Sequence, residues 1–519
     1  MKPLSLSENI SYKWVAMFIV MIGVFMTLLS TTIVNITLPK MMAELNTDTL
    51  GIQWVVITYM ISAAIAMPVT AWLGAAIGRR YTYIIGLVIF TGASLFCGQA
   101  WNLESMNIAR LIQGIGEGII VVIALTILYE TFPQNEKGLS MGIFGLGACF
   151  APALGPTLGG YLTEHLSWRW VFYINLPVGL LGLLLALVWL RETKPEEERL
   201  WRFDWIGFSM MAIMFSCLIT FLARGHEKEW LHSDFILTLI VLFGISLAAY
   251  LIWEGRSKAP LIDLRLFKDP VFSLCVLILV LGSMAIYGVF FLLPLYLVGL
   301  RLYPTTMAGL LMLPGSLATG VGVMIGGILS DRWRSKPVLL ISTIGLAWTS
   351  FHLSTLNLYT PKEIFLFDFI LWGGMMGLFF APALTLALSR LPAERVNMGS
   401  SIQNSLRLVA GSIGTSVAVT ILARKSAYHF EALSAKLTYA NIAFKQLFPK
   451  FSSYLLGKGG SVVNKQALAM AEMTIQQTAT SYAFQSCFIY LSLFALLGAI
   501  LVLFIHEPKV KVKRAAVVH

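Results

Sequence analysis

Residues 14–38 read WVAMFIVMIGVFMTLLSTTIVNITL and contain no charged side chain. A helix of this stretch is about 37 Å long at 1.5 Å per residue, enough to cross the roughly 30 Å hydrocarbon core of a membrane. The whole chain has the same character, because 57% of its 519 residues are hydrophobic and only 12% are charged. A soluble protein has roughly 25% charged residues. The sequence therefore predicts an all-α polytopic membrane protein.

About fourteen apolar blocks of this kind lie between polar breaks. No small-residue cleavage site follows the first block, so we interpret it as a retained signal anchor. The predicted spans are Trp14–Leu38, Ile52–Ile77, Tyr81–Ala100, Met106–Thr131, Leu139–Thr163, Trp168–Leu190, Trp205–Leu222, Phe235–Trp253, Val271–Val298, Thr305–Leu329, Val338–Leu356, Ile364–Leu391, Ser400–Leu422 and Tyr482–Ile505.

The basic residues test this count independently of hydropathy, because a wrong count would scramble the alternation of positively charged loops. The alternation holds with both termini in the cytoplasm, which requires an even number of spans. It also explains the net charge of +11, so we do not expect nucleic acid as a partner. The cytoplasmic clusters are Arg79/Arg80, Arg191/Lys194/Arg199/Arg202, Arg256/Lys258/Arg265/Lys268, Arg332/Arg334/Lys336, Arg390/Arg395 and Lys509/Lys511/Lys513/Arg514.

One external segment, Lys425–Ser481, is longer than a simple connection needs at roughly 55 residues. Glycines at 457, 459 and 460 divide it into two stretches that each predict a helix, the second from Val462 to Thr480. The sequence leaves open whether these helices rest on the lipid interface or form a docking surface for a partner protein. The amphipathic stripe of the first consists of Phe430, Leu433, Leu437, Ala440, Phe444 and Leu447.

Two kinds of motif predict where helices pack and bend. The short loops Gly78-Arg79-Arg80 and Gly327 to Asp331-Arg332 recur in the two halves of the chain, which suggests a duplication. We expect their glycines to allow close helix packing and their charges to bind helix ends on the cytoplasmic side. In the fifth span, ACFAPALGPTLGG (148–160), a proline removes a helix hydrogen bond and small residues permit close contact. The residues concerned are Gly155, Pro156, Gly159 and Gly160.

Together with SWRWVFYINLP (167–177) and TTIVNITLP (31–39), these motifs resemble the major facilitator superfamily. Within it the chain resembles the fourteen-span drug:proton antiporters of the EmrB/QacA type, most closely the EmrB type. The resemblance implies two six-helix bundles, residues 1–190 and 269–506, joined by two additional helices in 191–268 and followed by a cytoplasmic tail, 507–519. The segment 425–481 lies within the second bundle as a periplasmic loop.

The resemblance also implies a function, which is export of amphipathic drugs across the bacterial inner membrane in exchange for protons. It implies an EmrA-like periplasmic adaptor and a TolC-like outer-membrane channel as partners. Two departures bear on this expectation. The family usually has an acidic residue where this chain has Ser30, and the usual Asp and Arg of the first cytoplasmic loop are Ala75 and Ala76. The first change removes a favoured proton carrier.

Proton coupling needs a group that changes charge within the membrane, and few candidates exist. Glu117 lies seven residues after Arg110 on nearly the same helix face, about 10 Å further in. It is either the protonation site or a structural partner of Arg110. Asp368 is either a second proton carrier or a solvated residue at a helix start. Arg407 either meets an acidic group across the cavity or extends toward the cytoplasm.

In major facilitators the first, second, fourth and fifth helices of each half line the cavity. Aromatic and amide side chains on the corresponding spans are candidates for contact with planar or cationic ligands, although each could equally pack against helices or lipid. The candidates are Asn35, Gln53, Tyr59, Phe144, Tyr287, Phe291, Tyr296 and Phe380.

Other chemistry has little support in the sequence. The five cysteines lie in apolar blocks without a Cys-x-x-Cys pair, and the seven histidines have no ligand spacing. The stretch Gly114 to Gly118 mimics part of a dinucleotide fingerprint but has no strand before it. We therefore expect neither a metal nor a cofactor, and no enzymatic activity. The alternatives to an antiporter are a proton-coupled nutrient symporter and a membrane sensor or scaffold without transport.

Overall fold

The computed structural model describes residues 6–133, 154–192, 203–225, 227–257, 261–332, 335–388, 393–435 and 460–505, with the single residues 136, 144, 147 and 391. Within these ranges, 13 helices are long and apolar enough to cross a membrane. The fifth predicted span, Leu139–Thr163, is described continuously only from residue 154 onward. The all-α architecture of about fourteen spans is therefore confirmed.

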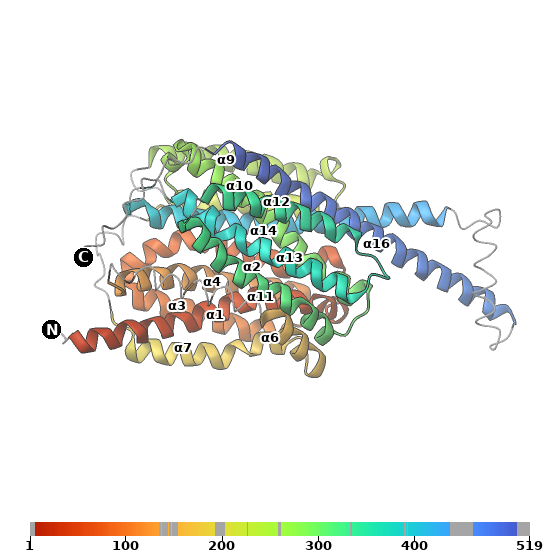
Figure 1. Ribbon diagram of the computed structural model, residues 1–519, viewed down its shortest axis with the longest axis horizontal. Helices are drawn as coiled ribbons and strands as arrows, with labels where there is room; N and C mark the ends of the chain where they lie inside the picture. Colours follow the sequence, from red (N-terminus) through yellow and green to blue (C-terminus); the bar gives the residue numbers. More distant parts are fainter. Residues whose placement is uncertain are drawn as a thin grey trace.

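The helices run back and forth along one axis (Figure 1). We call the end where α1 begins and α16 ends the terminal end, and the opposite one the distal end. The order is α1 (Leu6–Glu44), α2 (Thr49–Ile77), α3 (Arg79–Gly98), α4 (Leu103–Thr131), α6 (Trp170–Tyr173), α7 (Asn175–Trp189), α8 (Trp205–Arg224), α9 (Asp234–Arg256), α10 (Pro270–Pro294), the π-helix η4 (Leu295–Leu300), α11 (Thr305–Arg332), α12 (Ser335–His352), α13 (Lys362–Leu388), α14 (Ala393–Ser434) and α16 (Gly460–Leu503).

Short polar side chains fix where several helices begin. Asp48 accepts a hydrogen bond from the backbone N–H of Gly51 at 2.8 Å and so caps α2. Asn102 forms a capping box with Ser105 at the start of α4. These residues satisfy backbone groups that the first helical turn leaves unpaired. The apolar blocks thus begin as helices where a capping residue precedes them.

Of the two loop glycines, Gly327 does not have the packing role that the sequence predicted. Gly78 has a φ of 92°, a left-handed value that ends α2 and starts α3 in one residue. At Gly327 a Cβ atom would meet none of the described residues within 4 Å. Gly78 therefore makes a turn, and Gly327 faces open space. Arg79 follows the prediction more closely, because its Nη2 lies 3.0 Å from Glu130 Oε1 at the end of α4. The side chains of Asp331 and Arg332 lie outside the described residues.

The helices form two groups with the extra pair outside them. In the first group α2 and α3 pack on α4, and α1 packs on α4 and α7. In the second, α10 packs on α14 and α16, while α13 packs on α11 and α12. We call the interface between the two groups the seam. Helix α8 lies across it, because α8 packs against α2 of the first group and α14 of the second, and α9 packs on α8. The two inserted helices therefore lie outside the six-helix bundles.

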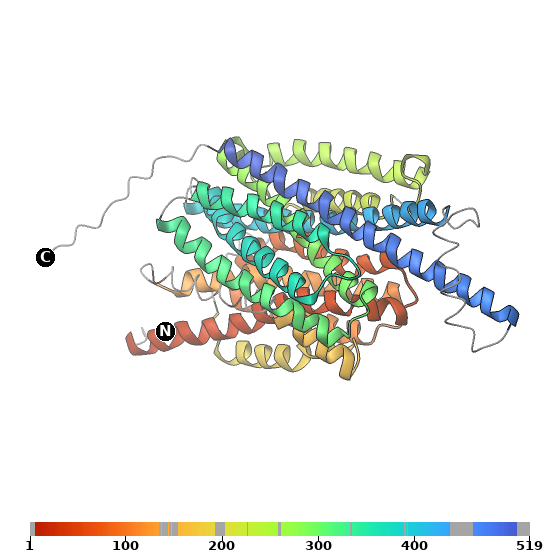
Figure 2. The same cartoon turned by 45° about the vertical axis from the view of Figure 1, so that its right-hand side comes forward.

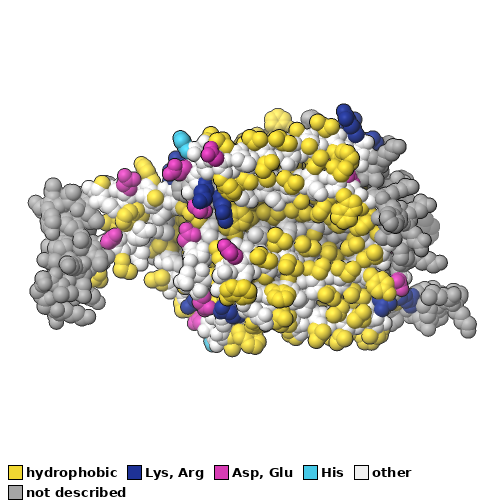
Figure 3. Space-filling view, turned by 180° about the vertical axis from the view of Figure 1, so that it is seen from behind, with side chains coloured by type: hydrophobic (Ala, Val, Ile, Leu, Met, Phe, Trp, Pro, Cys, Tyr) yellow, Lys and Arg dark blue, Asp and Glu magenta, His cyan; other side chains and the backbone are white. Residues whose placement is uncertain are grey.

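The outer surface suits lipid over most of its length. Figure 3 shows a broad apolar band across one face of the bundle, with Lys, Arg, Asp and Glu gathered toward its two ends. In α9, only 11% of the most apolar 18-residue stretch is buried against the rest of the protein. Bands of charge flanking an apolar girdle are typical of a protein that spans a bilayer.

The two longest helices differ from the expected external loop. Helices α14 and α16 have 42 and 44 residues, and both extend beyond the other helices at the distal end (Figures 1 and 2). Residues 425–434 continue α14, and residues 460–480 begin α16. The described parts of this segment are therefore continuous with membrane-spanning helices, since no proline or glycine interrupts α14 after Leu422. Whether they rest on lipid or dock a partner protein stays a prediction. The stripe residues Leu437 to Leu447 lie outside the described part.

Candidate functional site

A buried carboxylate lies where α1, α2 and α4 meet. Glu117 on α4 is 3% exposed. Its Oε1 is 3.4 Å from the Thr31 hydroxyl on α1, and its Oε2 has no hydrogen-bond partner within the described structure. Tyr59 on α2 is its other polar neighbour. A carboxylate with an unused oxygen in the interior is costly unless it can take a proton or a cation.

Arg110 is held by groups other than Glu117. Its Nε donates to the Val55 carbonyl at 2.9 Å, and its Nη1 donates to Gln113 Oε1 at 2.6 Å. The guanidinium also lies 3.8 Å from the centre of the Tyr59 ring. The described ion pairs do not join Arg110 to Glu117. Arg110 therefore braces α2 against α4, and the described ion pairs leave Glu117 without a basic partner.

The support of Arg110 gives a stability prediction. Gln113 accepts from Arg110 and donates from Nε2 to Ser94 Oγ at 2.7 Å, and all three side chains are buried. Gln113→Leu leaves a buried guanidinium with one partner fewer, which we expect to cost about 2–4 kcal/mol. Thermal unfolding in detergent measures this loss. Asn107→Leu on the same helix is the control, since the Asn107 Oδ1 has no partner. Equal melting temperatures for the two variants would contradict the bracing role.

A cation from the second bundle faces the same region. Arg407 on α14 donates from Nη1 to the Tyr287 hydroxyl on α10 at 3.1 Å, and its Cζ lies 5.8 Å from the Phe380 ring. Its Nε has no hydrogen-bond partner among the described residues. The charges of Arg407 and Arg110 both act on Glu117. Arg407 therefore lies across the interface between the two bundles from the carboxylate; whether it binds an acidic group there or extends toward the cytoplasm stays a prediction.

The sequence reasoning missed Gln403. It is fully buried on α14, and neither its Oε1 nor its Nε2 has a partner in the described structure. It precedes Arg407 by four residues, so both lie on one helix face. This spacing was visible in the sequence and could have identified it. Unpaired polar atoms on the helix face that also carries a cation indicate a site for a polar ligand or water.

Asp368 lies apart from the group of polar residues formed by Glu117, Arg407 and Gln403. It is buried on α13, and its Oδ1 is 2.9 Å from Nδ1 of His352 on α12. The interpretation as a solvated residue at a helix start is therefore wrong. Because α12 packs on α13 and α16 of the second bundle, this pair is separate from Glu117. Whether it carries a proton stays a prediction.

The predicted ligand residues divide into three sets. Tyr59, Tyr287 and Phe380 lie beside the two arginines. Gln53 instead faces the inserted pair, with Nε2 3.5 Å from the Ala223 carbonyl, and Tyr296 donates to the Asn357 carbonyl at the distal end. The remaining three are placed as follows: Asn35 is buried with an unpaired Oδ1, Phe291 is buried in the core, and Phe144 is half-buried against it.

The fifth span meets the second bundle at the distal end. Carboxylate Oε2 of Glu164 accepts from the backbone N–H of Thr306 at 2.8 Å, at the start of α11. The Thr305 hydroxyl donates to the Gly160 carbonyl at 3.2 Å. A Cβ at Gly160 would lie 2.4 Å from the Thr305 carbonyl oxygen, so only glycine permits this approach. Gly155 and Gly159 similarly lie close to the backbone of α1. The structure therefore has its distal contact closed.

This contact has a predictable pH dependence. The hydrogen bond from Thr306 lowers the pKa of Glu164, with a smaller contribution from His165. The bond therefore favours the closed contact above the ordinary glutamate pKa of about 4.3 and is lost as pH falls through the lowered value. Spin labels at Leu166 and Leu302 should separate in acid. Glu164→Gln should remove this dependence, whereas Glu104→Gln should keep it; an acid response unchanged in Glu164→Gln would contradict the assignment.

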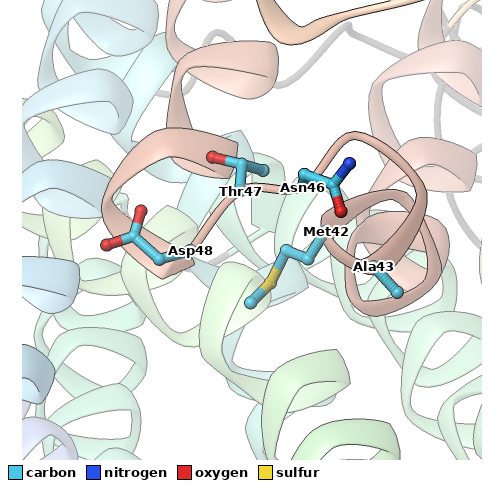
Figure 4. A pocket seen from close by; sticks show the side chains of 5 residues that line it. All are labelled: Met42, Ala43, Asn46, Thr47 and Asp48. Carbon is cyan, nitrogen blue, oxygen red and sulfur yellow. The ribbon is translucent and has the colours of Figure 1, made fainter.

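One surface pocket contains none of the predicted site residues. A pocket of about 690 Å³ at the turn between α1 and α2 is lined by Met42, Ala43, Asn46, Thr47 and Asp48 (Figure 4). Asp48 serves there as the cap of α2, and Figure 4 shows its carboxylate turned away from Asn46. Within the described residues, no group of three or more His, Cys, Asp or Glu side chains could hold a metal ion.

The fold and this arrangement agree with a known family. Residues 20–415 match the family model described as Major Facilitator Superfamily. A similar solved structure is a bacterial homologue of the human lysosomal transporter Spinster, with a TM-score of 0.60 and 13% identity over 95% of this chain and 96% of that one. Another is the xylose transporter XylE from E. coli, with a TM-score of 0.57 and 13% identity over 96% and 100%. The chain belongs to the Major Facilitator Superfamily and is a multi-pass membrane transporter.

Within the superfamily the chain is similar to multidrug export proteins of the EmrB type. It is 29% identical to Multidrug export protein EmrB of Escherichia coli (strain K12) over 427 residues, which cover 81% of this chain and 82% of EmrB. It is 31% identical to the uncharacterized MFS-type transporter YhcA of Bacillus subtilis (strain 168) over 441 residues, 85% and 82% of the two chains. The Fatty acid resistance protein FarB of Neisseria gonorrhoeae is 29% identical over 80% of this chain and 82% of FarB.

Proposed function

We propose that the protein exports amphipathic small molecules across the bacterial inner membrane in exchange for protons. The observation that carries this proposal is Glu117, a buried carboxylate with an unpaired oxygen on which Arg407 of the other bundle acts. It lies against Thr31, one residue from Ser30, where the related antiporters usually carry an acid. Glu117 thus supplies from α4 the carboxylate that α1 lacks.

The proposed cycle follows from these charges. When Glu117 is ionised, it and Arg407 attract each other across the seam, and a cationic drug can compete for the carboxylate. When Glu117 takes a proton, the attraction ends and the drug loses its partner. The two bundles rock around the central site so that drug and proton reach it from opposite sides. The aromatic rings of Tyr59, Tyr287 and Phe380 would contact the planar part of the drug.

The orientation that fits this cycle places both termini in the cytoplasm and the distal end in the periplasm. The alternation of basic loops supports it. We propose the same division of the chain that the sequence predicts, with bundles at 1–190 and 269–506 and an inserted pair at 191–268. On this orientation the closed contact at Glu164 faces the periplasm.

Transport in proteoliposomes tests the proposal. When a pH gradient drives protons into the liposomes, the protein should move an amphipathic cationic dye out of them. A protonophore should stop this movement of the dye. Movement of solute in the same direction as protons would favour the symporter alternative. An absence of any gradient-dependent movement would leave the sensor or scaffold and would contradict the proposal.

We also propose that the distal extension of α14 and α16 binds a periplasmic adaptor, EmrA-like, which leads to a TolC-like channel. Both helices rise beyond the bundle, as a docking surface would require (Figure 2). Deleting residues 430–480 should lower efflux from whole cells at least about tenfold while sparing transport in liposomes. Equal loss in both assays would show that the segment serves transport itself. A short flexible linker should join the two sides of the deletion, so that the ends of both spans are preserved and any loss of efflux does not come from strain on the spans.

A further inference from the structure

A basic pocket lies on the outside of the second bundle, away from the central site. It has a volume of about 420 Å³ and is lined by Ile421, Arg424, Lys425, Tyr428 and Tyr490. The first four residues belong to α14 and the last to α16. The pocket therefore joins two cations and two phenol hydroxyls, which are hydrogen-bond donors that suit a phosphate oxygen.

In the part of the chain that the structure describes, no acidic side chain pairs with the two cations of this pocket. Within the described residues, neither Arg424 nor Lys425 forms an ion pair, and Lys425 Nζ instead lies 5.5 Å from the centre of the Tyr428 ring. The sequence that follows adds cations and almost no acid. Between Arg424 and Lys465 the only acidic residue is Glu431, whereas the lysines are Lys425, Lys436, Lys445, Lys450, Lys458 and Lys465.

Neighbouring contacts place the pocket at the level of lipid headgroups. Gln485 on α16 donates to the Leu356 carbonyl at 3.1 Å, in the turn that ends the membrane-spanning part of α12. Ser426 on α14 lies 3.3 Å from Thr480, just beyond that level. Arg424 and Lys425 therefore lie next to the edge of the apolar girdle. Tyrosine and basic residues are typical of this interfacial layer.

An apolar track leads from the pocket into the membrane. Tyr490, Leu493 and Leu497 recur at three and four residues on α16, so they share one face. They are 43%, 45% and 50% exposed. A ligand with a phosphate head in the pocket could lay an acyl chain along this face. A free phosphate ion would have no use for it.

We propose that this pocket binds the headgroup phosphate of an anionic phospholipid, with an acyl chain along Tyr490, Leu493 and Leu497. On the orientation proposed above, the lipid belongs to the outer leaflet. The bound lipid would hold α14 and α16 together where both leave the membrane, close to the start of their distal extension.

Native mass spectrometry of the full chain, titrated with phosphatidylglycerol, tests this site. The variant Arg424→Gln/Lys425→Gln should bind about thirtyfold more weakly than the wild type, since each basic residue at an anionic surface adds about a factor of five. The control Arg224→Gln/Lys228→Gln removes the same charge from the distal end of α8 and should bind as the wild type does. Equal affinity in all three proteins would overturn the proposal.

Two further arms separate the lipid from other anions. Phosphatidylcholine should show no difference between the variants, and inorganic phosphate should not displace phosphatidylglycerol. Displacement by phosphate alone would make the pocket a free anion site and overturn the lipid assignment. Leu493→Asn should weaken binding of phosphatidylglycerol without creating a charge difference. An unchanged affinity in this variant would contradict the acyl track.

Discussion

Replacing Glu117 by glutamine is expected to abolish proton-driven transport while leaving exchange of the transported molecule intact. Glutamine has nearly the same shape and can still accept a hydrogen bond from Thr31, 3.4 Å from the native carboxylate. It cannot gain or lose a proton. A pH gradient of one unit supports about tenfold accumulation for each coupled proton, so accumulation in Glu117→Gln should fall to the level without a gradient.

Two assays in the same proteoliposomes separate coupling from folding. Gradient-driven accumulation should disappear in Glu117→Gln, whereas counterflow of labelled against unlabelled substrate should persist. Glu104→Gln is the matched control, because it makes the same change on the exposed first turn of α4. If Glu117→Gln still accumulates substrate in response to the gradient, another group carries the proton. His352 and Asp368 would then be the next pair to test.

The sequence predicts the spans of this protein well because hydrocarbon imposes one strict demand. Every backbone group must be paired within its own segment, so each long apolar block must be a helix. The charged residues inside spans were visible for the same reason. Glu117 and Arg110 stand out because an ionisable group in hydrocarbon needs a specific environment. Their burial, 3% and 1% exposed, agrees with that expectation.

The partners of these charges could not be predicted in the same way. Arg110 lies close enough to Glu117 along α4 for an ion pair, yet it bonds to the Val55 carbonyl of α2 and to Gln113. That choice depends on how closely α2 crosses α4, which a periodicity does not give. The pairing of Asp368 with His352 depends likewise on the contact between α12 and α13. Interhelical geometry, rather than helix existence, limits prediction of the site.

The length of α14 and α16 was also missed for a physical reason. Hydropathy marks where a helix leaves the hydrocarbon, whereas the helix itself ends only where its backbone is interrupted. After Leu422 the residues become polar without a proline or glycine, and so α14 continues to Ser434. The same rule explains why α16 begins at Gly460, the last residue of a cluster of glycines. Membrane boundaries and helix boundaries are thus different features of this sequence.

The close approach of the fifth span to α11 leads to a second prediction, that Gly309→Ala shifts the protein toward a state open at the distal end. A Cβ at Gly309 would lie 2.2 Å from the Pro156 carbonyl oxygen, and backbone at this point cannot give way cheaply. The Thr157 hydroxyl donates to the Gly309 carbonyl at 3.3 Å in the same contact. Gly309→Ala therefore opposes closure of the distal end. An overpacked contact costs about 2 kcal/mol, which shifts the balance toward the distally open state about thirtyfold.

Such a shift should appear both in structure and in transport. With native cysteines replaced and spin labels placed at the exposed residues Leu166 and Leu302, Gly309→Ala should lengthen the distance between the bundles at the distal end. Transport should fall at least about tenfold, since a transporter held open on one side cannot complete its cycle. Gly327→Ala makes the same change on the same helix where nothing lies within 4 Å, and it should match the wild type in both assays. Unchanged label distances in Gly309→Ala, with the protein still folded, would mean that the contact between the fifth span and α11 does not control the distal opening.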